Sequence, residues 1–341
     1  MPASMQRAAA TLIGSLLLLS LPSAAAAQTP TPTPPPPAST PTPVPAPPPS
    51  GGSMSIKLER THRVGRDDVV LRGDRVRVRG AVAPYVPGQT AVVRLYRGRK
   101  KLAAKAAAIK PVAGTPNGAF VVRLKPAKGR ITVRASHRAT AAQVTMVAKA
   151  RRVLVVTPRA SPGARGPIVR LIQSRLARLR YVVSRSGSFD ASTARAVIAY
   201  RKVRGMSRVA VASRSVVRGL LARRGSFKPK YPTHGKHVEV DLSRQVMVLM
   251  RGRRVDRIYG VSSGKASTPT VLGRFRVYSK TIGTNSLGMV DSSYFIGGYA
   301  VHGYVSVPTF PASHGCVRVP IPNARSIYNW LRIGDRVDVY P

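Results

Sequence analysis

The sequence of 341 residues contains a single cysteine, Cys316, and only 11 acidic residues. One cysteine excludes any disulfide within the chain, so the fold must be stabilised by other means. A lone thiol is then a reactive group, a bridge to a second molecule or a buried structural side chain. The residues around it in the sequence decide between these alternatives.

Long apolar runs are confined to the start of the chain. Arg7 precedes an apolar run over residues 8–21, and small residues follow up to Ala27. This order predicts a secretory signal peptide over residues 1–27, with an uncleaved N-terminal anchor as the alternative. No later segment is apolar enough to cross a membrane, so we expect no transmembrane helix in the mature chain. Residues 28–54, rich in proline and threonine, predict an extended linker suited to an exported protein of the cell wall.

Acidic residues are so few that 57 lysines and arginines leave a formal net charge of +46. Residues 231–341 carry +8 of this charge, and the residues before them carry +38. Such an excess implies an anionic partner, for which nucleic acid is the usual candidate. Outside a membrane the available polyanions are wall polymers and lipid head groups. We therefore expect anionic wall polymers and no nucleic acid, with a solvated basic surface as the other interpretation.

Residues 55–157 show a pattern of short strands separated by turns such as Pro87-Gly88 and Asn117-Gly118. The apolar segments fall at residues 75–79, 90–96, 120–124 and 131–133. Short strands at roughly ten-residue spacing predict a small β-sandwich, and the pattern resembles bacterial immunoglobulin-like modules. No catalytic set of residues stands out here, so we expect a spacer or a wall-binding module.

Residues 158–226 change to helical spacing and predict a compact module of three helices. The apolar stripes are Val169, Ile172, Leu176 and Leu179; Ala194, Val197, Ile198 and Tyr200; and Val216, Val217, Leu220 and Leu221. Asp190 is the predicted start of the second helix. With Gly166, Gly187 and Phe189, the segment resembles the peptidoglycan-binding-domain-1 family. It departs from that family at Tyr200-Arg201 and around residues 208–212, so a plain helical spacer stays open beside glycan binding.

Residues 235–341 return to the strand pattern, with a hairpin that turns at Ser243-Arg244. Further strands are predicted at residues 254–262, 274–278 and 337–340. Asn323 is predicted to cap a helix that continues to Leu331, and Gly334 is predicted to stop it. The whole chain is therefore expected to be multi-domain and mainly β: an immunoglobulin-like β-sandwich, a small three-helix module and a β-rich C-terminal domain.

Two short segments near the C-terminus carry the chemistry. His302-Gly303 lies fourteen residues before Cys316, and Ser313-His314-Gly315 directly precedes it. A thiol attacks as its thiolate, so it needs a nearby base or positive charge. Glycine after each histidine permits tight backbone geometry, and Gly315 would leave backbone N–H groups free for a developing oxyanion. The pattern predicts a cysteine nucleophile with a histidine base.

These segments, with Arg318 and the sequence TPTVLGRF at residues 268–275, resemble the YkuD-type L,D-transpeptidase catalytic domain. The resemblance covers residues 235–341. It implies a β-rich fold in which Cys316 is the nucleophile, His302 is the general base and the Gly303 carbonyl orients the imidazole. It implies no cofactor and no metal.

The same resemblance assigns supporting roles around the nucleophile. Ser313, His314 and Gly315 are expected to shape the oxyanion pocket, although His314 has a purely structural reading as well. Arg318 is expected to support the loop or to meet a substrate carboxylate. Met289 and Tyr294 are expected to line the pocket for the donor stem. Zinc held by these histidines and Cys316 is disfavoured, because the one-residue gap between His314 and Cys316 suits a tetrahedral site poorly.

The function implied is peptidoglycan L,D-transpeptidation, with a role in wall biogenesis and cell shape. Cys316 would form a thioester with a tetrapeptide stem, release D-Ala and pass the acyl group to a second stem, giving a 3→3 cross-link. Water as acceptor would make the enzyme an L,D-carboxypeptidase. A papain-like hydrolase is disfavoured because its cysteine precedes its histidine. A non-catalytic wall-binding protein or a nucleic-acid binder would leave the surroundings of Cys316 unexplained.

Overall fold

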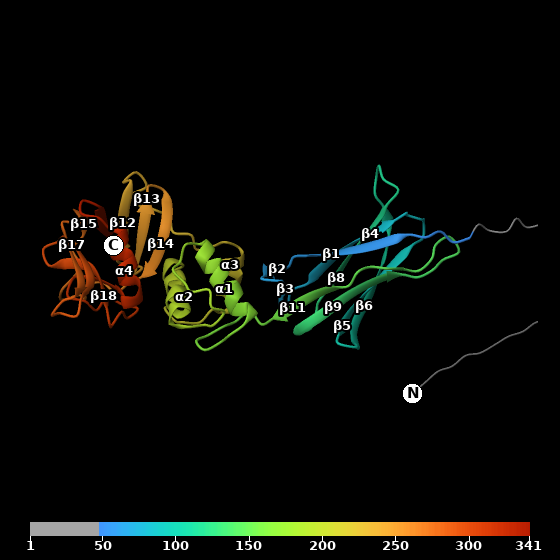
Figure 1. Ribbon diagram of the computed structural model, residues 1–341, viewed down its shortest axis with the longest axis horizontal. Coiled ribbons are helices and arrows are strands. Elements are labelled where there is room, and N and C mark those ends of the chain that lie inside the picture. The colour runs from blue at the N-terminus through green and yellow to red at the C-terminus, as the bar shows by residue number, and fades with distance from the viewer. Residues whose placement is uncertain (1–47) are drawn as a thin grey trace, which may run out of the picture. The chain divides into compact units, whose positions relative to one another are not determined.

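The computed structural model describes residues 48–341, drawn in colour in Figure 1. The predicted signal peptide, residues 1–27, and most of the predicted linker, residues 28–54, lie outside the described residues. Strand β1 (Ser53–Glu59) begins two residues before the predicted start of the β region at residue 55. Within residues 48–341, no helix has the length and apolar character needed to span a membrane.

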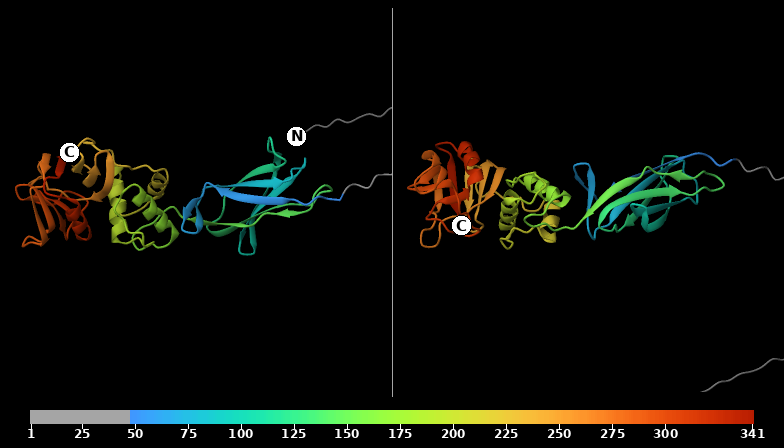
Figure 2. Two further views of the ribbon diagram at one scale, coloured as in Figure 1. Left: turned by 45° about the horizontal axis from the view of Figure 1, so that its top comes forward. Right: turned by 60° about the horizontal axis from the view of Figure 1, so that its bottom comes forward.

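Residues 53–156 form two β-sheets, which make up the blue and green strands of Figure 2. The first has the order β1, β4 (Val76–Ala83), β8 (Gly118–Leu124) and β7 (Lys110–Pro111). The second has the order β2 (His62–Val64), β3 (Asp67–Leu71), β11 (Arg151–Val156), β9 (Gly129–His137), β5 (Thr90–Arg97) and β6 (Lys100–Ala108), with β10 (Met146–Val147) paired to β9. Val76, Val78 and Val82 of β4 are buried in the core that both sheets share. The alternation of valine with arginine is thus the period of a strand with one buried face.

Three helices follow: α1 (Pro167–Arg178), α2 (Ala191–Val203) and α3 (Arg214–Leu221). The prediction that Asp190 begins the second helix is confirmed, since its side chain accepts the Thr193 N–H at 2.8 Å. Ser213 caps α3 in the same way. The helices pack on one another around buried side chains that include Leu176 and Tyr200. The same core takes in side chains of the C-terminal region, as described below.

The C-terminal region contains two further sheets and one helix. The first sheet has the order β14 (Arg254–Gly260), β13 (Val246–Arg251), β12 (Lys236–Asp241), β20 (Arg336–Tyr340) and β15 (Gly273–Arg276). The second has the order β16 (Ser279–Thr284), β17 (Val290–Ile296), β18 (Tyr299–Tyr304) and β19 (Val317–Pro320). Helix α4 (Ile321–Trp330) packs with both sheets around one core. The predicted hairpin across Ser243-Arg244 is confirmed as β12 and β13.

The prediction that Asn323 caps the last helix is wrong. Helix α4 begins at Ile321, directly after Pro320, so Asn323 lies inside its first turn. Proline pre-sets the backbone angle of a first helical turn, and Pro322 allows the helix to start without a capping side chain. The helix also ends at Trp330, before Gly334, because Leu331 adopts an extended conformation.

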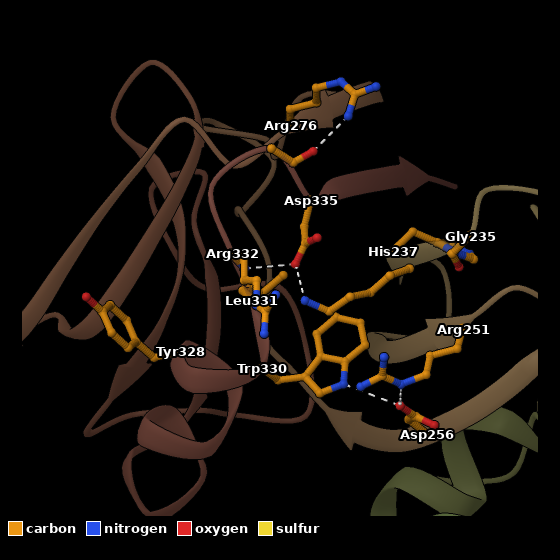
Figure 3. Close-up of polar contacts among 12 residues, drawn as sticks. Gly235, His237, Arg251, Asp256, Arg276, Tyr328, Trp330, Leu331, Arg332 and Asp335 are labelled. Carbon is orange, nitrogen blue, oxygen red and sulfur yellow. Dashed lines mark hydrogen bonds and ion pairs between the residues drawn. The ribbon is translucent and has the colours of Figure 1, made fainter.

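Charged side chains anchor the end of α4 around Trp330 (Figure 3). The indole N–H donates to Asp256 at 3.3 Å, and the Lys236 ammonium lies 4.6 Å from the ring centre. The guanidinium of Arg251 lies 5.6 Å from the same ring and also donates to Asp256. Lys236 pairs with Asp335 in the turn before β20. These contacts tie α4 to the first sheet, and α4 in turn supports the second sheet.

The first C-terminal sheet shares a buried core with α1, α2 and α3, which together with their connections (residues 158–226) are called the helical segment. The core of α1, α2 and α3 includes Val246, Val248 and Met250 of β13 and Ile258 of β14. Tyr181 forms a bridge with Ile258, and the Ile258 N–H donates to the Arg180 carbonyl at 2.9 Å. The helical segment is therefore packed onto the outer face of the first C-terminal sheet by a continuous apolar core.

Candidate active site

Strands β18 and β19 bring two separate segments of the chain together. They run parallel, with Val301 opposite Val317 and His302 opposite Arg318. Cys316 precedes Val317 and so lies beside Ala300, whose N–H donates to the cysteine sulfur at 3.4 Å. Two residues along a strand span about 6.6 Å and place their side chains on one face. Cys316 thus lies opposite Ala300, which is two residues before His302 in β18. The thiol and the imidazole share one face at the edge of this pair of strands.

The imidazole of His302 is buried, with 2% of the residue exposed. Its Nδ1 lies 2.9 Å from the Gly303 carbonyl, which accepts only from N–H, so the proton is on Nδ1 and Nε2 is free. Burial lowers the pKa of His302 to about 4, the Gly303 carbonyl opposes that shift, and the charge of Arg318 adds to it. The imidazole is therefore neutral and able to accept a proton.

The Cys316 thiol is half-buried and remains open to solvent. Burial raises its pKa, while the Ala300 N–H and the charge of Arg318 act in the opposite direction. The sulfur lies 3.8 Å from the Gly298 carbonyl, to which it can donate as a thiol. The resting site is thus a neutral thiol beside a neutral imidazole. The expected lowering of the thiol pKa is absent because burial outweighs the two favourable contacts.

Hydrogen bonds fix the loop that leads to Cys316. The Ser313 hydroxyl donates to the Cys316 carbonyl at 2.6 Å and accepts the Gly315 N–H at 3.1 Å. The Thr270 hydroxyl donates to the Gly315 carbonyl at 2.7 Å, and that of Thr268 donates to the Ser313 carbonyl at 3.1 Å. The Gly315 N–H is therefore occupied by Ser313, so the backbone N–H groups expected to be free for an oxyanion do not include that of Gly315.

Gly315 adopts a backbone angle φ of +117°, which favours glycine. A Cβ atom at this position would also collide with the ring of Tyr299. His314, next to it, is exposed, and its Nε2 lies 3.4 Å from the ammonium of Lys265. The structure therefore places Ser313 and Gly315 in the support of the loop and His314 at its surface.

Arg318 lies in β19, opposite His302, rather than in the loop. Its guanidinium lies 4.1 Å from the ring centre of Tyr304, and the same ring meets the imidazole of His302 edge-on at 5.6 Å. Tyr304 is thus held between the two side chains. Its position next to Gly303 in the sequence was the only signal for this role, and it was not singled out from the sequence.

The two remaining predicted residues belong to the hairpin of β16 and β17. Tyr294 lies opposite Ala300 in the register of β17 with β18, and Cys316 lies beside the same residue on the other side of β18. Met289 is buried and directly precedes β17, where its N–H donates to the Asn285 side chain. Both residues border the site, whereas Thr268, Thr270 and Tyr299 support it without having been given roles from the sequence.

No metal cluster is formed by the His, Cys, Asp and Glu side chains of residues 48–341. The model of the L,D-transpeptidase catalytic domain family named YkuD matches residues 235–339. These residues belong to the YkuD family. The matched range contains His302, Cys316 and the whole loop between them.

Solved structures of L,D-transpeptidases resemble the chain as well. The enzyme from Xylanimonas cellulosilytica is 35% identical over 54% of this chain and 98% of its own, with a TM-score of 0.49. The enzyme from Stackebrandtia nassauensis is 21% identical over 53% of this chain and 95% of its own, with a TM-score of 0.35. An L,D-transpeptidase from Mycobacterium tuberculosis is 21% identical over 31% of this chain and 58% of its own, with a TM-score of 0.29. A comparison with curated proteins gives no match.

The YkuD match extends over both C-terminal sheets and α4, from the start of β12 to β20. The chain therefore carries an L,D-transpeptidase domain, a class of acyltransferase that acts on peptidoglycan.

Proposed function

We propose that the chain forms 3→3 cross-links in peptidoglycan through a thioester on Cys316. The observation that carries the proposal is the register of β18 with β19, which puts a neutral imidazole beside the one thiol of the chain. The Nδ1–H of His302 donates to the Gly303 carbonyl, so Nε2 is the atom available to take a proton. This arrangement is that of a nucleophile, a base and a group that orients the base.

Acylation begins when Cys316 attacks the carbonyl between the third residue of a tetrapeptide stem and its terminal D-Ala. The thiol proton passes to Nε2 of His302 as the sulfur–carbon bond forms. The carbon–nitrogen bond then breaks, and the D-Ala amine leaves with the proton from His302. The Gly303 carbonyl stabilises the imidazolium that exists between these two transfers, as the third member of a triad does.

Deacylation transfers the acyl group to an acceptor. The side-chain amine of a second stem attacks the thioester, and a new amide bond forms. The carbon–sulfur bond then breaks, and the proton of the amine returns to the sulfur through His302. The energy of the broken amide is retained in the thioester, so no nucleotide is required. With water as acceptor the product is a tripeptide stem, which is the L,D-carboxypeptidase alternative.

Backbone donors for the oxyanion must come from groups other than the Gly315 N–H, which Ser313 occupies. The backbone N–H groups of His314 and Cys316 are at the same turn, and we propose that they serve this role. Tyr294 and Met289 are proposed to contact the donor stem, because Tyr294 pairs with Ala300, whose N–H donates to the Cys316 sulfur, and Met289 directly precedes the strand of Tyr294. Arg318 is proposed to hold Tyr304 against His302 and to meet a substrate carboxylate.

The test uses the full chain and a disaccharide-tetrapeptide, with products separated by mass spectrometry. Release of D-Ala with a cross-linked dimer supports the transpeptidase, and a tripeptide alone supports the carboxypeptidase. Cys316→Ala should abolish both products, and His302→Ala should slow them by about 10²- to 10⁴-fold. His62→Ala, which alters a histidine of the N-terminal sheets, is the control and should keep full activity. Unchanged product formation by Cys316→Ala would end the proposal.

The segments before the YkuD domain are proposed to hold the enzyme in the wall. Residues 55–157 are proposed to be an immunoglobulin-like module, and residues 158–226 a peptidoglycan-binding module. We also propose that the chain is exported and acts outside the membrane. The proposal that the chain binds anionic wall polymers is supported by a cavity of about 870 Å³. Its lining contains six cationic side chains and no acidic one. These are Arg72, Arg97, Lys125, Lys128, Arg159 and Arg214.

A further inference from the structure

Lys202 is a buried lysine whose described contacts include no carboxylate. It lies in α2, and 4% of the residue is exposed. Its ammonium donates to the carbonyls of Gln245 at 3.0 Å and Val261 at 2.9 Å, both in the YkuD domain. Burial lowers its pKa to about 7, and the charge of Arg208 acts in the same direction. Burying a long cationic side chain is unfavourable unless its donors are used, so these two contacts define its position.

The carbonyls that Lys202 contacts belong to a small hydrogen-bonded unit. Gln245 is a left-handed residue, with φ of +56°, and its carbonyl also accepts the Val261 N–H at 3.0 Å. The Gln245 side chain accepts the Ser263 N–H at 2.9 Å and donates to the Ser263 hydroxyl at 2.6 Å. Gln245 therefore joins the helical segment on one side to the backbone of Ser263 on the other.

Ser263 in turn holds the loop of the nucleophile. Its carbonyl accepts the Ala312 N–H at 2.8 Å and the Ser313 N–H at 2.9 Å. Its neighbour Ser262 exchanges two backbone hydrogen bonds with Arg318, at 3.1 and 2.9 Å. Ser313 then bonds to the carbonyl of Cys316. A continuous path of hydrogen bonds thus leads from Lys202 through Gln245 and Ser263 to the loop before Cys316.

Arg208 supplies a second contact from the helical segment to the same loop. Its guanidinium donates to the Thr309 carbonyl at 2.7 Å and to the Ser243 carbonyl at 2.8 Å. Thr309 lies between β18 and the nucleophile, next to Phe310, which is 58% exposed. Val305, in the same loop, is 84% exposed. Since apolar burial holds this loop weakly, polar contacts to its backbone determine where it lies.

We propose that Lys202 and Arg208 are positioning residues, through which the helical segment holds the loop between His302 and Cys316 in its catalytic conformation. The segment would then act in the reaction itself, in addition to any binding of the wall. This inference rests on the proposed function of Cys316. An error of about 1 Å at a nucleophile costs about 10²-fold in rate, so even a modest relaxation of this loop should be measurable.

The test compares Lys202→Met and Arg208→Met in the full chain, since methionine keeps an unbranched, flexible side chain but has no donor. Arg204→Met is the matched control, because Arg204 lies two residues beyond Lys202 and is exposed. We expect kcat for D-Ala release from a soluble disaccharide-tetrapeptide to fall about ten- to hundredfold in both variants, with KM nearly unchanged. Arg208→Lys, which keeps one donor for the Thr309 carbonyl, should recover part of kcat.

Two further measurements make the result decisive. Circular dichroism identifies a variant that does not fold, in which case Arg208→Met, altered at a half-buried side chain, carries the test. The rate constant of Cys316 alkylation by iodoacetamide should change in both methionine variants and not in Arg204→Met. A kcat within about twofold of the unaltered chain in both folded variants, or a loss confined to sacculus binding, overturns the inference. If the unaltered chain releases no D-Ala, the proposed function fails, and the alkylation rates alone decide whether the loop is positioned by these residues.

Discussion

At the scale of the residue, the proposed chemistry depends on the charge states of His302 and Cys316. His302 and Cys316 are both neutral at rest, because burial disfavours the charged form of each. The more familiar arrangement of cysteine enzymes is a thiolate paired with an imidazolium. Here the proton is expected to leave the sulfur only when a substrate carbonyl is in place. Such a site is expected to be active over the pH range in which the His302 imidazole is neutral and can accept a proton.

The pH dependence of the reaction follows from this arrangement. His302 has a lowered pKa of about 4, so it is neutral above that pH and loses its function as a base as the pH falls through it. The pKa of Cys316 is raised, so the thiol stays protonated beyond its ordinary range near 9. We expect kcat/KM to be flat from about pH 5 to 8 and to fall below about pH 4. A pH profile with soluble substrate measures this.

Replacing Arg318 tests how its charge affects the pKa values of His302 and Cys316. Arg318→Met removes a positive charge that lowers the pKa of both groups, so the acid limb of the profile should move to higher pH. Thiolate absorbance of the free enzyme should be absent at pH 7 in both proteins. A strong thiolate signal at pH 7 in the unaltered chain would contradict the neutral pair.

At the scale of the element, β18 is pressed closely against α4. A Cβ atom on Gly303 would lie 2.6 Å from that of Ala324 and 3.2 Å from the Ile321 backbone. We expect Gly303→Ala to lower the melting temperature and to displace the carbonyl that orients His302, with a destabilisation of about 1–3 kcal/mol. The prediction is checked by thermal unfolding together with the rate of D-Ala release.

The double variant Gly303→Ala with Ala324→Gly removes the closest of these contacts and should restore part of the stability. Gly51→Ala, at a position where a Cβ atom meets nothing within 4 Å, should leave both measurements unchanged. If Gly303→Ala behaved like Gly51→Ala, the close packing of β18 on α4 would not matter for the site.

Elements could be predicted from the sequence where one local pattern decides them. The alternation of Val238, Val240 and Leu242 before Ser243-Arg244 was enough for the β12 and β13 hairpin. The helix near residue 323 was placed too late, because proline in the first turn replaces the capping side chain that the prediction looked for. Local patterns therefore identify a segment more reliably than they locate its ends.

Contacts between distant segments could not be predicted in this way. The stripe of Ala194, Val197 and Ile198 describes the apolar face of α2, whereas Lys202 reads as a solvated residue. Its burial depends on the carbonyls of Gln245 and Val261, which no pattern in α2 reveals. The motif around Cys316 was found because catalysis requires those residue types at that spacing. Thr270 was recognised only as part of the sequence TPTVLGRF, and its hydrogen bond to the Gly315 carbonyl, like the close packing of Tyr299 on Gly315, left no signal in the sequence.

At the scale of the whole molecule, the YkuD domain and the helical segment share one hydrophobic core. Val246, Val248 and Ile258 are buried against the helices and would meet water in a chain truncated to residues 231–341. Each buried side chain of this kind contributes about 1.5–3 kcal/mol. We expect residues 231–341 alone to be less stable than residues 158–341, with a lower melting temperature and a greater tendency to aggregate.

Scanning calorimetry or thermal circular dichroism of the two truncated chains checks this prediction. Equal melting temperatures would show that the shared core adds nothing to stability. The comparison also bears on activity, since the chain of residues 231–341 lacks the donors of Lys202 and Arg208 and the chain of residues 158–341 keeps them. Tests of catalysis are therefore best made with the helical segment present.

The protonated state of Cys316 has a consequence for the lifetime of the enzyme. A cysteine reacts with peroxides and disulfides as its nucleophilic thiolate, so a sulfur that keeps its proton is oxidised slowly in oxidising surroundings. The chain offers no second cysteine to which a damaged one could be joined for later repair. Burial thus keeps the Cys316 thiol protonated between encounters with substrate. The protonated state protects the sulfur from oxidation without any additional component.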